Sequence, residues 1–549
     1  MLRKPLVFLV AIFLLSVVLR FYKLGSLPPS LNWDEVAWGY NAYSLGTDLK
    51  DEFGRFLPLD YLESFGDFKP PVYAYLSVLP VKIFGLSEFS VRLASAFFGA
   101  LTVGATYFLT KQLFKKEENR ESLALVASLL LSISPWHILL SRAAFEANVA
   151  TFLIIFGVLA FLKGVWEKTL PAGRQGLWLI LSLVSFALSL MTFNTARFVA
   201  PVLGITLLVH FRKKIWQKKK AFLIGVFLSF LILLPTLIFL TTSQSKLRFR
   251  EVNIFSDLGV IETSNQEVAN DNYAWWSKVI HNRRWGHARS FLSHYFDHFN
   301  PQFLFISGDG NPKLSSQQVG QFYLTSLPFL VLGILFLLKR KQGLYRFIFL
   351  WLLVGIIPAA TARETPHALR IETTLPTWQI ITAFGLVSFL TALKKKLIFK
   401  RIFLVLVPLL FLANFTYFTH HYLFHYPREY ANEWQYGYKE AIEFAKKNEA
   451  QYDRVYFTNQ LGRPYIYFLF YLKKAPAWFR EKAVVEREVF GFVKVKSMGK
   501  YYFGEKFEER DPNERVLYFD VVDQVPNSAR VLRDFYLPNG DQALTAYEF

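Results

Sequence analysis

Residues 212–241 read RKKIWQKKKAFLIGVFLSFLILLPTLIFLT, a basic cluster followed by an apolar run. The run over 221–241 has about the length that an α-helix needs to cross the hydrocarbon core of a bilayer. It contains no charged residue, whereas a surface helix of a soluble protein carries polar side chains along one face. Lys and Arg flanking a span favour the cytoplasmic side. The stretch therefore predicts a membrane-spanning helix that begins inside, near residue 220.

Comparable runs recur along a chain of 549 residues, of which 53% are hydrophobic and 57 are Phe. We predict spans over residues 5–22, 88–114, 121–140, 147–165, 176–191, 197–211, 221–241, 320–338, 344–360, 371–393 and 401–419. Bulky and basic residues follow the first run where a signal peptide would carry a small-residue cleavage site, so we expect it to be retained. The predicted fold class is an all-α polytopic membrane protein with about eleven transmembrane helices.

Basic clusters separate alternate runs and set the predicted orientation. They lie within residues 111–120, 163–174, 212–220, 339–341 and 394–401. All five fall on one side if the N-terminus is cytoplasmic. This assignment requires that the short apolar run 70–85 does not cross the membrane. We therefore predict that it forms a juxtamembrane helix on the outer face.

The segments predicted outside include the loops 23–87 and 242–319 and the tail 420–549. The tail is expected to form a small extracytoplasmic α/β domain, with a helix over 438–448 and strands over 452–458 and 515–523. Residues 1–419 are expected to form the transmembrane domain. The net charge of +20 comes from clusters between apolar runs, which excludes a basic nucleic-acid-binding face. The absence of cysteine excludes thiol catalysis, thiolate metal sites and disulfides.

Two adjacent carboxylates, Asp34 and Glu35, lie just beyond the first predicted span. A carboxylate suits general-base catalysis on a hydroxyl, and Lys or Arg suits phosphate binding. The same loop supplies Lys69, and Arg92 begins the second span. A structural alternative stays open for two of these residues. Asp34 would cap a helix over 35–45, and Lys69 would be an interfacial lysine whose ammonium reaches toward water.

Other ionisable residues lie at the outer ends of later spans, where charge is costly unless it is paired or functional. They are Arg142, Glu146, Arg197, His367 and Arg370. Arg142 and Glu146 are four residues apart, so they share a helix face and the alternative is a simple ion pair. The cations within 363–370 are predicted outside, against the positive-inside trend, which favours an anionic partner such as a phosphate.

The loop 242–319 is rich in aromatic and histidine residues, which suit either stacking on sugars or the headgroup belt of a membrane. His294 and His298 are four residues apart. They would ligate a metal only together with further partners.

In their order, spacing and membrane side, these stretches resemble the protein-mannosyltransferase and aminoarabinose-transferase branch of the GT-C glycosyltransferases. The matching stretches are Asp34-Glu35, Lys69-Pro70-Pro71, Glu88 with Val91-Arg92-Leu93, Ser141-Arg142 with Glu146, and His367-Ala368-Leu369-Arg370. The resemblance is good over 1–210, looser over 211–420 and thin in the tail. Members of this branch usually carry Asp where this chain has Glu146.

The resemblance implies transfer of a sugar from a polyprenyl-phosphate carrier to a hydroxyl of a protein, lipid or glycan, with inversion. The site would face the extracytoplasmic side of the plasma (inner) membrane. The acids implied in catalysis are Asp34, Glu35 and Glu146. The residues implied in holding the donor phosphate are Lys69, Arg92, Arg142, Arg197, His367 and Arg370. Some relatives bind a divalent metal and others do not, so a metal held by Asp34 and Glu146 stays open.

Two other classes of function compete with a transferase. A transporter or flippase of a lipid-linked or anionic substrate would also place ionisable residues among spans. Such proteins usually show internal repeats and helices broken near the membrane midplane, and this sequence has no internal repeat. A membrane scaffold whose tail binds a partner would not explain cations beside carboxylates at the outer ends of spans.

Overall fold

The computed structural model describes residues 3–166, 172–247, 253–340, 343–393, 396–487, 493–504 and 514–549. They fall into two compact units. The first unit consists of Met1–Leu19, Phe98–Leu140 and Ala147–Phe418, and the second of Arg20–Phe97, Ser141–Glu146 and Thr419–Phe549. The second unit thus combines the first outer loop with the tail, which the sequence suggested as a separate domain. Parts of the basic clusters 163–174, 339–341 and 394–401 lie outside the described residues.

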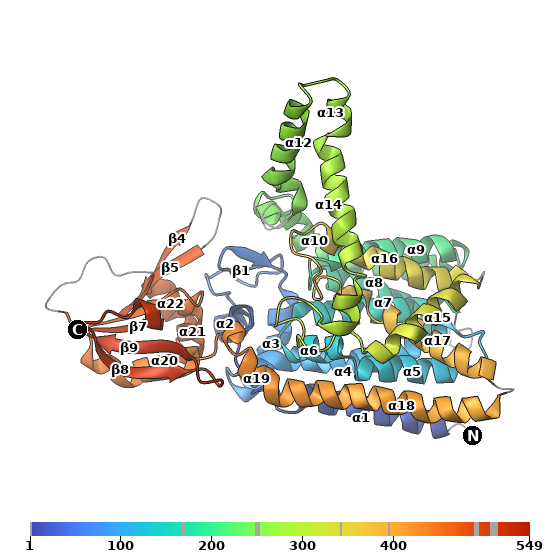
Figure 1. Ribbon diagram of the computed structural model, residues 1–549, viewed down its shortest axis with the longest axis horizontal. Helices are drawn as coiled ribbons and strands as arrows, with labels where there is room; N and C mark the ends of the chain where they lie inside the picture. Colours follow the sequence, from blue (N-terminus) through green and yellow to red (C-terminus); the bar gives the residue numbers. More distant parts are fainter. Residues whose placement is uncertain are drawn as a thin grey trace. The chain divides into compact units, whose positions relative to one another are not determined.

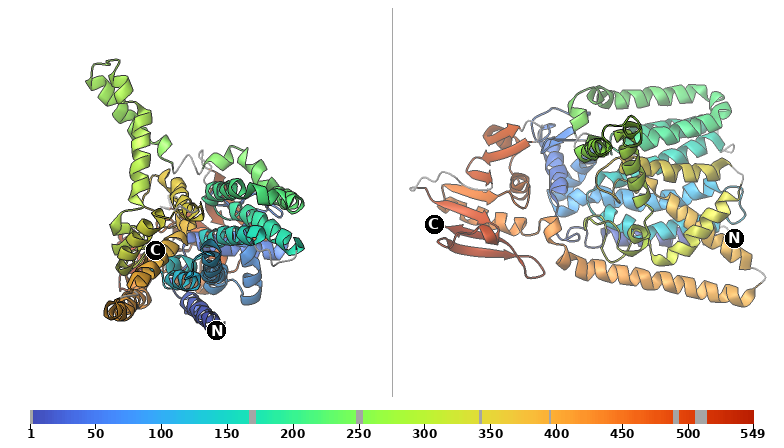
Figure 2. Two further views of the ribbon diagram at one scale, coloured as in Figure 1. Left: turned by 90° about the vertical axis from the view of Figure 1, so that its right-hand side faces the viewer. Right: turned by 45° about the horizontal axis from the view of Figure 1, so that its top comes forward.

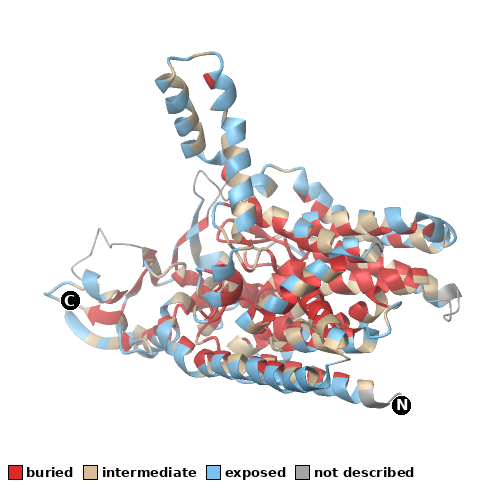
Figure 3. Cartoon of the chain, turned by 45° about the vertical axis from the view of Figure 1, so that its right-hand side comes forward, coloured by how far each residue is buried: buried red, intermediate tan, exposed pale blue. Residues whose placement is uncertain are grey.

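Apolar helices make up most of the first unit, and several of them cross a border between the units (Figure 1). They are α1 (Arg3–Phe21), α4 (Glu88–Leu113), α5 (Arg120–Ser132), α6 (Pro135–Arg142), α7 (Glu146–Trp166), α8 (Ala172–Leu190), α9 (Ala196–Trp216), α10 (Lys219–Leu240), α15 (Leu327–Leu338), α16 (Gly343–Ala360), α17 (Thr377–Ala392) and α18 (Leu397–His420). Buried residues gather on the faces that these helices turn toward one another (Figure 3).

Four helices among the described residues are long and apolar enough to cross a membrane. They are α4, α7, α10 and the continuous stretch Leu397–Glu429. The bent pair formed by α5 and α6 would make a fifth span. Six shorter apolar helices cover 5–21, 72–84, 174–190, 324–338, 344–360 and 377–392. The helices agree with a multi-pass membrane protein, and the number of spans and their orientation stay predictions.

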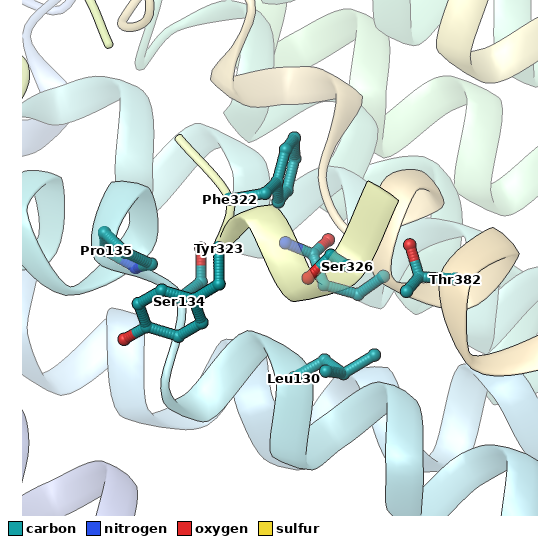
Figure 4. Close-up of a pocket in the computed structure, with 8 residues that line it drawn as sticks. Leu130, Ser134, Pro135, Phe322, Tyr323, Ser326 and Thr382 are labelled. Carbon is teal, nitrogen blue, oxygen red and sulfur yellow. The ribbon is translucent and has the colours of Figure 1, made fainter. Parts of the chain in front are cut away.

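A sharp break divides the predicted span 121–140 into α5 and α6, which meet at 55°. Pro135 begins α6, and proline lacks the N–H that would continue the hydrogen-bond ladder. The freed carbonyl of Ile133 accepts a hydrogen bond of 2.7 Å from the Tyr323 hydroxyl. Figure 4 shows Tyr323 beside Ser134 and Pro135 at this break, in a small cavity. A neighbouring side chain therefore satisfies the backbone where the helix is interrupted.

Glycines allow α15 and α17 to approach closely. A Cβ atom added at Gly333 would lie 2.0 Å from the carbonyl oxygen of Ile381, and one added at Gly385 would lie 2.0 Å from that of Phe329. Small residues at such crossings increase backbone contact where lipid offers no hydrophobic driving force. A side chain at either position would push the two helices apart.

The tail portion of the second unit carries a mixed seven-stranded sheet in the order β4-β5-β6-β3-β7-β9-β8. The strands are β3 (Arg454–Thr458), β4 (Ala483–Arg487), β5 (Val493–Met498), β6 (Tyr501–Gly504), β7 (Val516–Asp520), β8 (Arg530–Tyr536) and β9 (Gln542–Glu548). β3 is parallel to β6 and β7. The helices of this portion are α19 (Tyr426–Glu429), α20 (Tyr438–Asn448), α21 (Pro464–Tyr471) and α22 (Pro476–Lys482). The predicted helix over 438–448 and the predicted strands near 452–458 and 515–523 are confirmed.

The loop portion of the second unit contains α2 (Trp33–Asp48), the hairpin of β1 (Leu62–Ser64) and β2 (Asp67–Lys69), and α3 (Val72–Phe84). α2 is buried along most of its length and packs against α3 and α21. A Cβ atom at Gly39 of α2 would lie 2.5 Å from Val91 and 2.6 Å from Phe470. Glycine thus allows these elements to pack closely around the helix that carries the predicted acids.

Candidate active site

The first turn of α2 is fixed by a reciprocal cap that places Asp34 and Glu35. The Asn32 side chain accepts hydrogen bonds from the backbone N–H groups of Asp34 (2.9 Å) and Glu35 (3.1 Å). The Glu35 carboxylate in turn accepts from the Asn32 N–H at 3.1 Å. The cap is therefore Asn32, and the interpretation of Asp34 as the cap is wrong. The Asp34 carboxylate is 49% exposed.

Lys69 is held at the end of a strained two-residue hairpin. Phe65 and Gly66 connect β1 to β2 with positive φ angles of 62° and 81°. Gly adopts such angles without cost, but Phe does not, so its conformation must be held by its surroundings. Lys69 is 8% exposed, and its ammonium lies 5.1 Å from the centre of the Trp38 ring and 5.5 Å from that of Phe65. These aromatic faces stabilise a cation held away from bulk water.

The Lys69 ammonium donates a hydrogen bond to the Asp34 carboxylate, and the two form an ion pair. The carboxylate of Glu146, at the start of α7, interacts electrostatically with both residues. The structure therefore brings together Asp34, Lys69 and Glu146, which the sequence separates by up to 112 residues (146 minus 34). The pair combines a half-exposed carboxylate with a buried cation, which suits a substrate that presents a hydroxyl and a phosphate.

Glu35 and Arg92 form a fully buried ion pair directly behind this site. Arg92 Nε donates to Glu35 at 2.8 Å, and its Nη1 and Nη2 donate to the backbone carbonyls of Leu24, Pro28 and Ser30. Glu35 also accepts from the Ala144 N–H at 2.9 Å. With neither side chain exposed, this geometry favours a positioning role for Glu35 and Arg92. The catalytic role of Glu35 and the phosphate-binding role of Arg92 stay predictions.

Arg142 is buried in the same unit and holds the loop after α1. Its Nη2 donates to the carbonyl oxygens of Tyr22 at 2.6 Å and Leu27 at 3.1 Å, and its guanidinium carbon lies 5.7 Å from the centre of the Tyr422 ring. At 1% exposure, Arg142 has the environment of a structural cation. This arrangement likewise favours a positioning role over contact with the donor phosphate.

Residues of the tail bind the hairpin that carries Lys69. Arg487 of β4 binds Glu63 of β1 with both of its terminal nitrogens, and the backbone N–H of Val493 donates to the Phe65 carbonyl at 3.2 Å. The Tyr465 ring packs edge-on against Phe65 at 5.9 Å. These contacts hold the strained turn, so the tail helps to fix the position of the Lys69 ammonium.

Glu52 is buried in the same loop and holds it through two hydrogen bonds. Its carboxylate accepts a hydrogen bond of 2.7 Å from the Tyr465 hydroxyl, and its backbone N–H donates to the Asn41 side chain at 3.0 Å. The pKa of Glu52 is raised to about 8, chiefly by burial and also by nearby Asp51 and Glu63, while the Tyr465 hydrogen bond and Lys69 oppose the rise. Glu52 is therefore uncharged in the folded protein at neutral pH.

We expect the Glu52→Gln variant to flatten the pH dependence of stability. The unfolded pKa of Glu52 is 4.5 and the folded value is about 8, so folding favours the protonated acid. The contribution of Glu52 to the free energy of unfolding is then fully present below pH 4.5 and declines as the pH rises toward 8. The thermal unfolding midpoint at pH 5.5 and at pH 8.5 should differ less in the variant than in the wild type.

A matched control is Glu486→Gln, which changes a carboxylate that is exposed on β4. This control should keep the wild-type difference between the two pH values. An unchanged difference in Glu52→Gln would show that Glu52 is not the group that titrates.

Arg197, His367 and Arg370 belong to the first unit. Arg197 Nε donates to the Leu190 carbonyl at 3.2 Å. Arg370 Nη1 donates to the Glu364 carbonyl at 3.3 Å, and the His367 backbone N–H donates to His298 Nε2 at 3.2 Å. Burial, aided by Arg370, holds the pKa of His367 well below its usual range. His367 is thus neutral at neutral pH. The donor-phosphate role of all three residues stays a prediction.

Asp309 organises the loop that bears His367 and Arg370. Its carboxylate accepts hydrogen bonds from the backbone N–H groups of Ala368 at 2.6 Å and Asn311 at 2.8 Å. Burial raises the pKa of Asp309 to about 6. No local sequence pattern indicates that this carboxylate holds a segment about sixty residues later in the chain.

The side chains near Asp34 and Glu146 do not form a ready metal site. A divalent cation takes several oxygen or nitrogen ligands, and the described part of the chain contains no group of three or more His, Asp or Glu residues placed to hold one. His294 Nδ1 and His298 Nδ1 each lie 2.8 Å from a backbone carbonyl oxygen, of Ala362 and His294 respectively. Positive charge beside Asp34 is supplied by Lys69.

Comparison with known proteins gives a family match over part of the chain and a shared fold. Residues 10–252 match the family of dolichyl-phosphate-mannose-protein mannosyltransferases. An uncharacterized protein of Aquifex aeolicus is 26% identical over 204 residues, and the match covers 37% of this chain and 36% of that protein. The chain therefore spans little more than a third of the length of this curated relative.

Two solved structures share the fold. ArnT from Cupriavidus metallidurans bound to undecaprenyl phosphate has a TM-score of 0.55 at 12% identity, covering 99% of this chain and 97% of ArnT. The oligosaccharyltransferase AglB of Archaeoglobus fulgidus, in complex with an inhibitory peptide and a dolichol-phosphate, has a TM-score of 0.50 at 13% identity, covering 86% of this chain and 64% of AglB. The chain is thus similar to the protein-mannosyltransferase family over residues 10–252, and it shares its overall fold with ArnT and AglB.

Proposed function

We propose that the protein is an inverting glycosyltransferase that moves a sugar from a polyprenyl-phosphate carrier to a hydroxyl acceptor. The observation that carries this proposal is the Asp34–Lys69 pair, a half-exposed carboxylate beside a buried ammonium at the end of a held hairpin. The family match over residues 10–252, and the carriers bound in ArnT and AglB, support a lipid-phosphate donor. A transporter would have no need for a carboxylate placed to take a proton beside a phosphate-binding cation.

In the proposed reaction, the acceptor oxygen attacks the anomeric carbon of the donor sugar from the face opposite the phosphate. The bond between that carbon and the phosphate oxygen breaks, and the electron pair stays on the phosphate. The Lys69 ammonium stabilises the charge that develops there. The acceptor proton passes to the Asp34 carboxylate as the new bond forms. The Glu146 carboxyl, which interacts electrostatically with Asp34 and Lys69, orients the acceptor hydroxyl.

Arrival of the donor changes the partner of Lys69. In the free protein its ammonium is bound to Asp34. A donor phosphate competes for the same ammonium, because charge-assisted hydrogen bonds to phosphate are strong. Asp34 is then released to accept a proton from the acceptor. The carboxylate is therefore released from Lys69 only when a donor is present.

A panel of donors tests this proposal. Purified protein in lipid nanodiscs is incubated with polyprenyl-phosphate sugars and, separately, with nucleotide sugars, each labelled in the sugar, together with a membrane extract as the source of acceptors. We expect label to leave only the polyprenyl-phosphate donors. Transfer from a nucleotide sugar alone, or from neither class, would contradict the proposal.

We further propose that the site faces the extracytoplasmic side, because this orientation keeps the basic clusters inside. A topology reporter fused after Tyr430 should then be extracytoplasmic. A cytoplasmic signal from that fusion would reverse the orientation of the protein.

A further inference from the structure

A helical arm extends from the bundle of the first unit. We use "the arm" for residues 257–300, which contain α12 (Leu258–Asn270), α13 (Ser277–Ile280) and α14 (Arg283–Asp297). It points away from the bundle and runs across the direction of the apolar helices in the views of Figures 1 and 2. Most of its surface is exposed (Figure 3). If the apolar helices span a bilayer, an arm that runs across their direction lies along the membrane plane.

The base of the arm is tied to the end of α16. The Ile254 backbone N–H donates to the Thr361 carbonyl at 2.9 Å, and His294 Nδ1 lies 2.8 Å from the Ala362 carbonyl. The Tyr295 hydroxyl donates to the Leu353 carbonyl at 3.0 Å, within the last turns of α16. The arm therefore leaves the bundle where a predicted span ends, at the depth of a membrane–water interface.

Large apolar side chains are exposed along the arm in a regular pattern. On α14, Trp285, Leu292 and Phe296 are 68%, 53% and 63% exposed. With Arg289 they follow the spacing i, i+4, i+7 and i+11, which is one face of an α-helix. Further exposed apolar residues gather at the tip of the arm. They are Tyr273, Trp275, Trp276, Val279 and Ile280, with Trp275 reaching 80% exposure.

Charge is divided between the two long helices of the arm. The segment 273–296, which includes α13 and all of α14 except its last residue, Asp297, contains no Asp or Glu. Its cations are Lys278, Arg283, Arg284 and Arg289. α12 carries the acids Glu262 and Glu267. In Figure 1, α14 stands on the side toward which the spans extend, and α12 stands on the other side. The aromatic and basic helix thus faces the bilayer, and the acidic helix faces water.

We propose that the arm is an interfacial membrane-binding element whose α13–α14 side lies among lipid headgroups beside the bundle. An amphipathic helix with aromatic residues on one side and Lys or Arg nearby is suited to this layer, and Trp and Tyr are enriched there. The basic residues would bind the phosphates of anionic lipids, while Trp275, Trp285, Leu292 and Phe296 enter the upper acyl region. The exposed apolar surface is then covered by lipid, so no second protein is needed to cover it.

The arm also contacts the loop that carries His367 and Arg370. The Thr365 hydroxyl donates to Asp297 at 2.7 Å, and His298 Nε2 accepts from the His367 N–H. Both contacts come from the base of the arm. Binding of the arm to headgroups would therefore fix the depth of this loop relative to the lipid phosphates. The membrane-binding proposal itself does not depend on the enzymatic activity.

Fluorescence quenching tests the placement of the arm, and the absence of cysteine from the chain makes the full-length protein a ready background. Single variants Trp275→Cys and Leu292→Cys are labelled with a small fluorophore in nanodiscs that hold one copy of the protein. The lipid is phosphatidylcholine with phosphatidylglycerol, and part of it carries a nitroxide on the headgroup or deep in the acyl chain. We expect both labels to lose most of their fluorescence with the headgroup nitroxide and less with the deep one.

Gln266→Cys, exposed on α12, is the matched control and should be quenched little by either lipid. Equal quenching at positions 266, 275 and 292 would overturn the proposed side of the arm. If the labels at 275 and 292 were not quenched in single-copy nanodiscs, the proposal of membrane binding would be wrong. If these labels were shielded from water only when two copies share a disc, the surface would instead bind a second copy of the protein.

The basic residues are tested separately with the double variant Arg283→Ala/Arg284→Ala in the Trp275→Cys background. Quenching should weaken in this variant when phosphatidylglycerol is present and should change little in pure phosphatidylcholine. Loss of the same size in both lipids would contradict a role for anionic headgroups.

Discussion

Replacing Asp34 with asparagine is expected to lower the rate of sugar transfer by a factor of about 10²–10⁴, the range typical of a lost general base. Asparagine has nearly the same shape and still offers an oxygen to the Lys69 ammonium, so the hairpin stays in place. It has no basic carboxylate to take the acceptor proton. The loss should therefore appear in kcat, with a smaller change in the KM of the donor. Both constants are measured with labelled donor in nanodiscs.

Asp60→Asn is the matched control for this variant. Asp60 lies in the same loop, and its carboxylate is paired with Arg55 at 2.8 Å near the surface. Because exposed ion pairs contribute little to stability, the control should retain a rate close to that of the wild type. If Asp34→Asn transferred sugar as fast as Asp60→Asn, Asp34 would not be the base, and another acid such as Glu146 would have to take its role.

Replacing Lys69 with methionine is expected to impair use of the donor more severely than use of the acceptor. Methionine keeps an unbranched apolar chain between the Trp38 and Phe65 rings but removes the charge. Loss of one electrostatic contact to a developing anion typically lowers kcat by about 10²–10³. The donor KM should also rise, because the phosphate loses its cation in the ground state as well. Initial rates at varied donor and fixed acceptor, and the reverse, separate the two effects.

Lys50→Met removes an exposed lysine from the same loop and should leave both constants close to the wild-type values. A Lys69→Met protein with an unchanged donor KM and kcat would place the donor phosphate elsewhere. Folding of both variants is compared by their thermal unfolding midpoints, so that a lost hairpin is distinguished from a lost charge.

Features encoded by local sequence patterns were predictable. The apolar runs gave most helices of the first unit, because length and apolar composition act within one segment. The helix over 438–448 followed from its periodicity, and it forms as α20. The bend after α5 could also have been predicted from the sequence. Pro135 lies inside the predicted span 121–140, and proline interrupts a helix.

The cap of α2 shows a local signal that was present but misassigned. Asn32, followed three residues later by Glu35, has the spacing of a reciprocal cap, and the structure forms both of its hydrogen bonds. Asp34 is also a common capping residue, so the sequence offered two candidates two positions apart. The choice matters for function, because with Asn32 as the cap the Asp34 carboxylate binds the Lys69 ammonium.

The roles of the buried arginines could not be derived from sequence. Arg92 binds Glu35 across 57 residues, and Arg142 binds Tyr22 across 120. An arginine that holds a phosphate and one that holds backbone carbonyls look alike in a sequence. Only burial and the positions of partners distinguish them. The same holds for the attachment of the tail to the first loop through Tyr465–Glu52 and Arg487–Glu63, at separations of 413 and 424 residues.

The most direct test is an experimental structure of the protein with undecaprenyl phosphate bound, in which the distance from the lipid phosphate oxygens to Lys69 Nζ is measured. We expect a phosphate oxygen within about 4 Å of that nitrogen, the usual limit of an ion pair, with the Asp34 carboxylate turned away from Lys69 toward the space for the sugar. A phosphate bound far from Lys69, or an intact Asp34–Lys69 pair in the loaded protein, would contradict the proposed reaction centre.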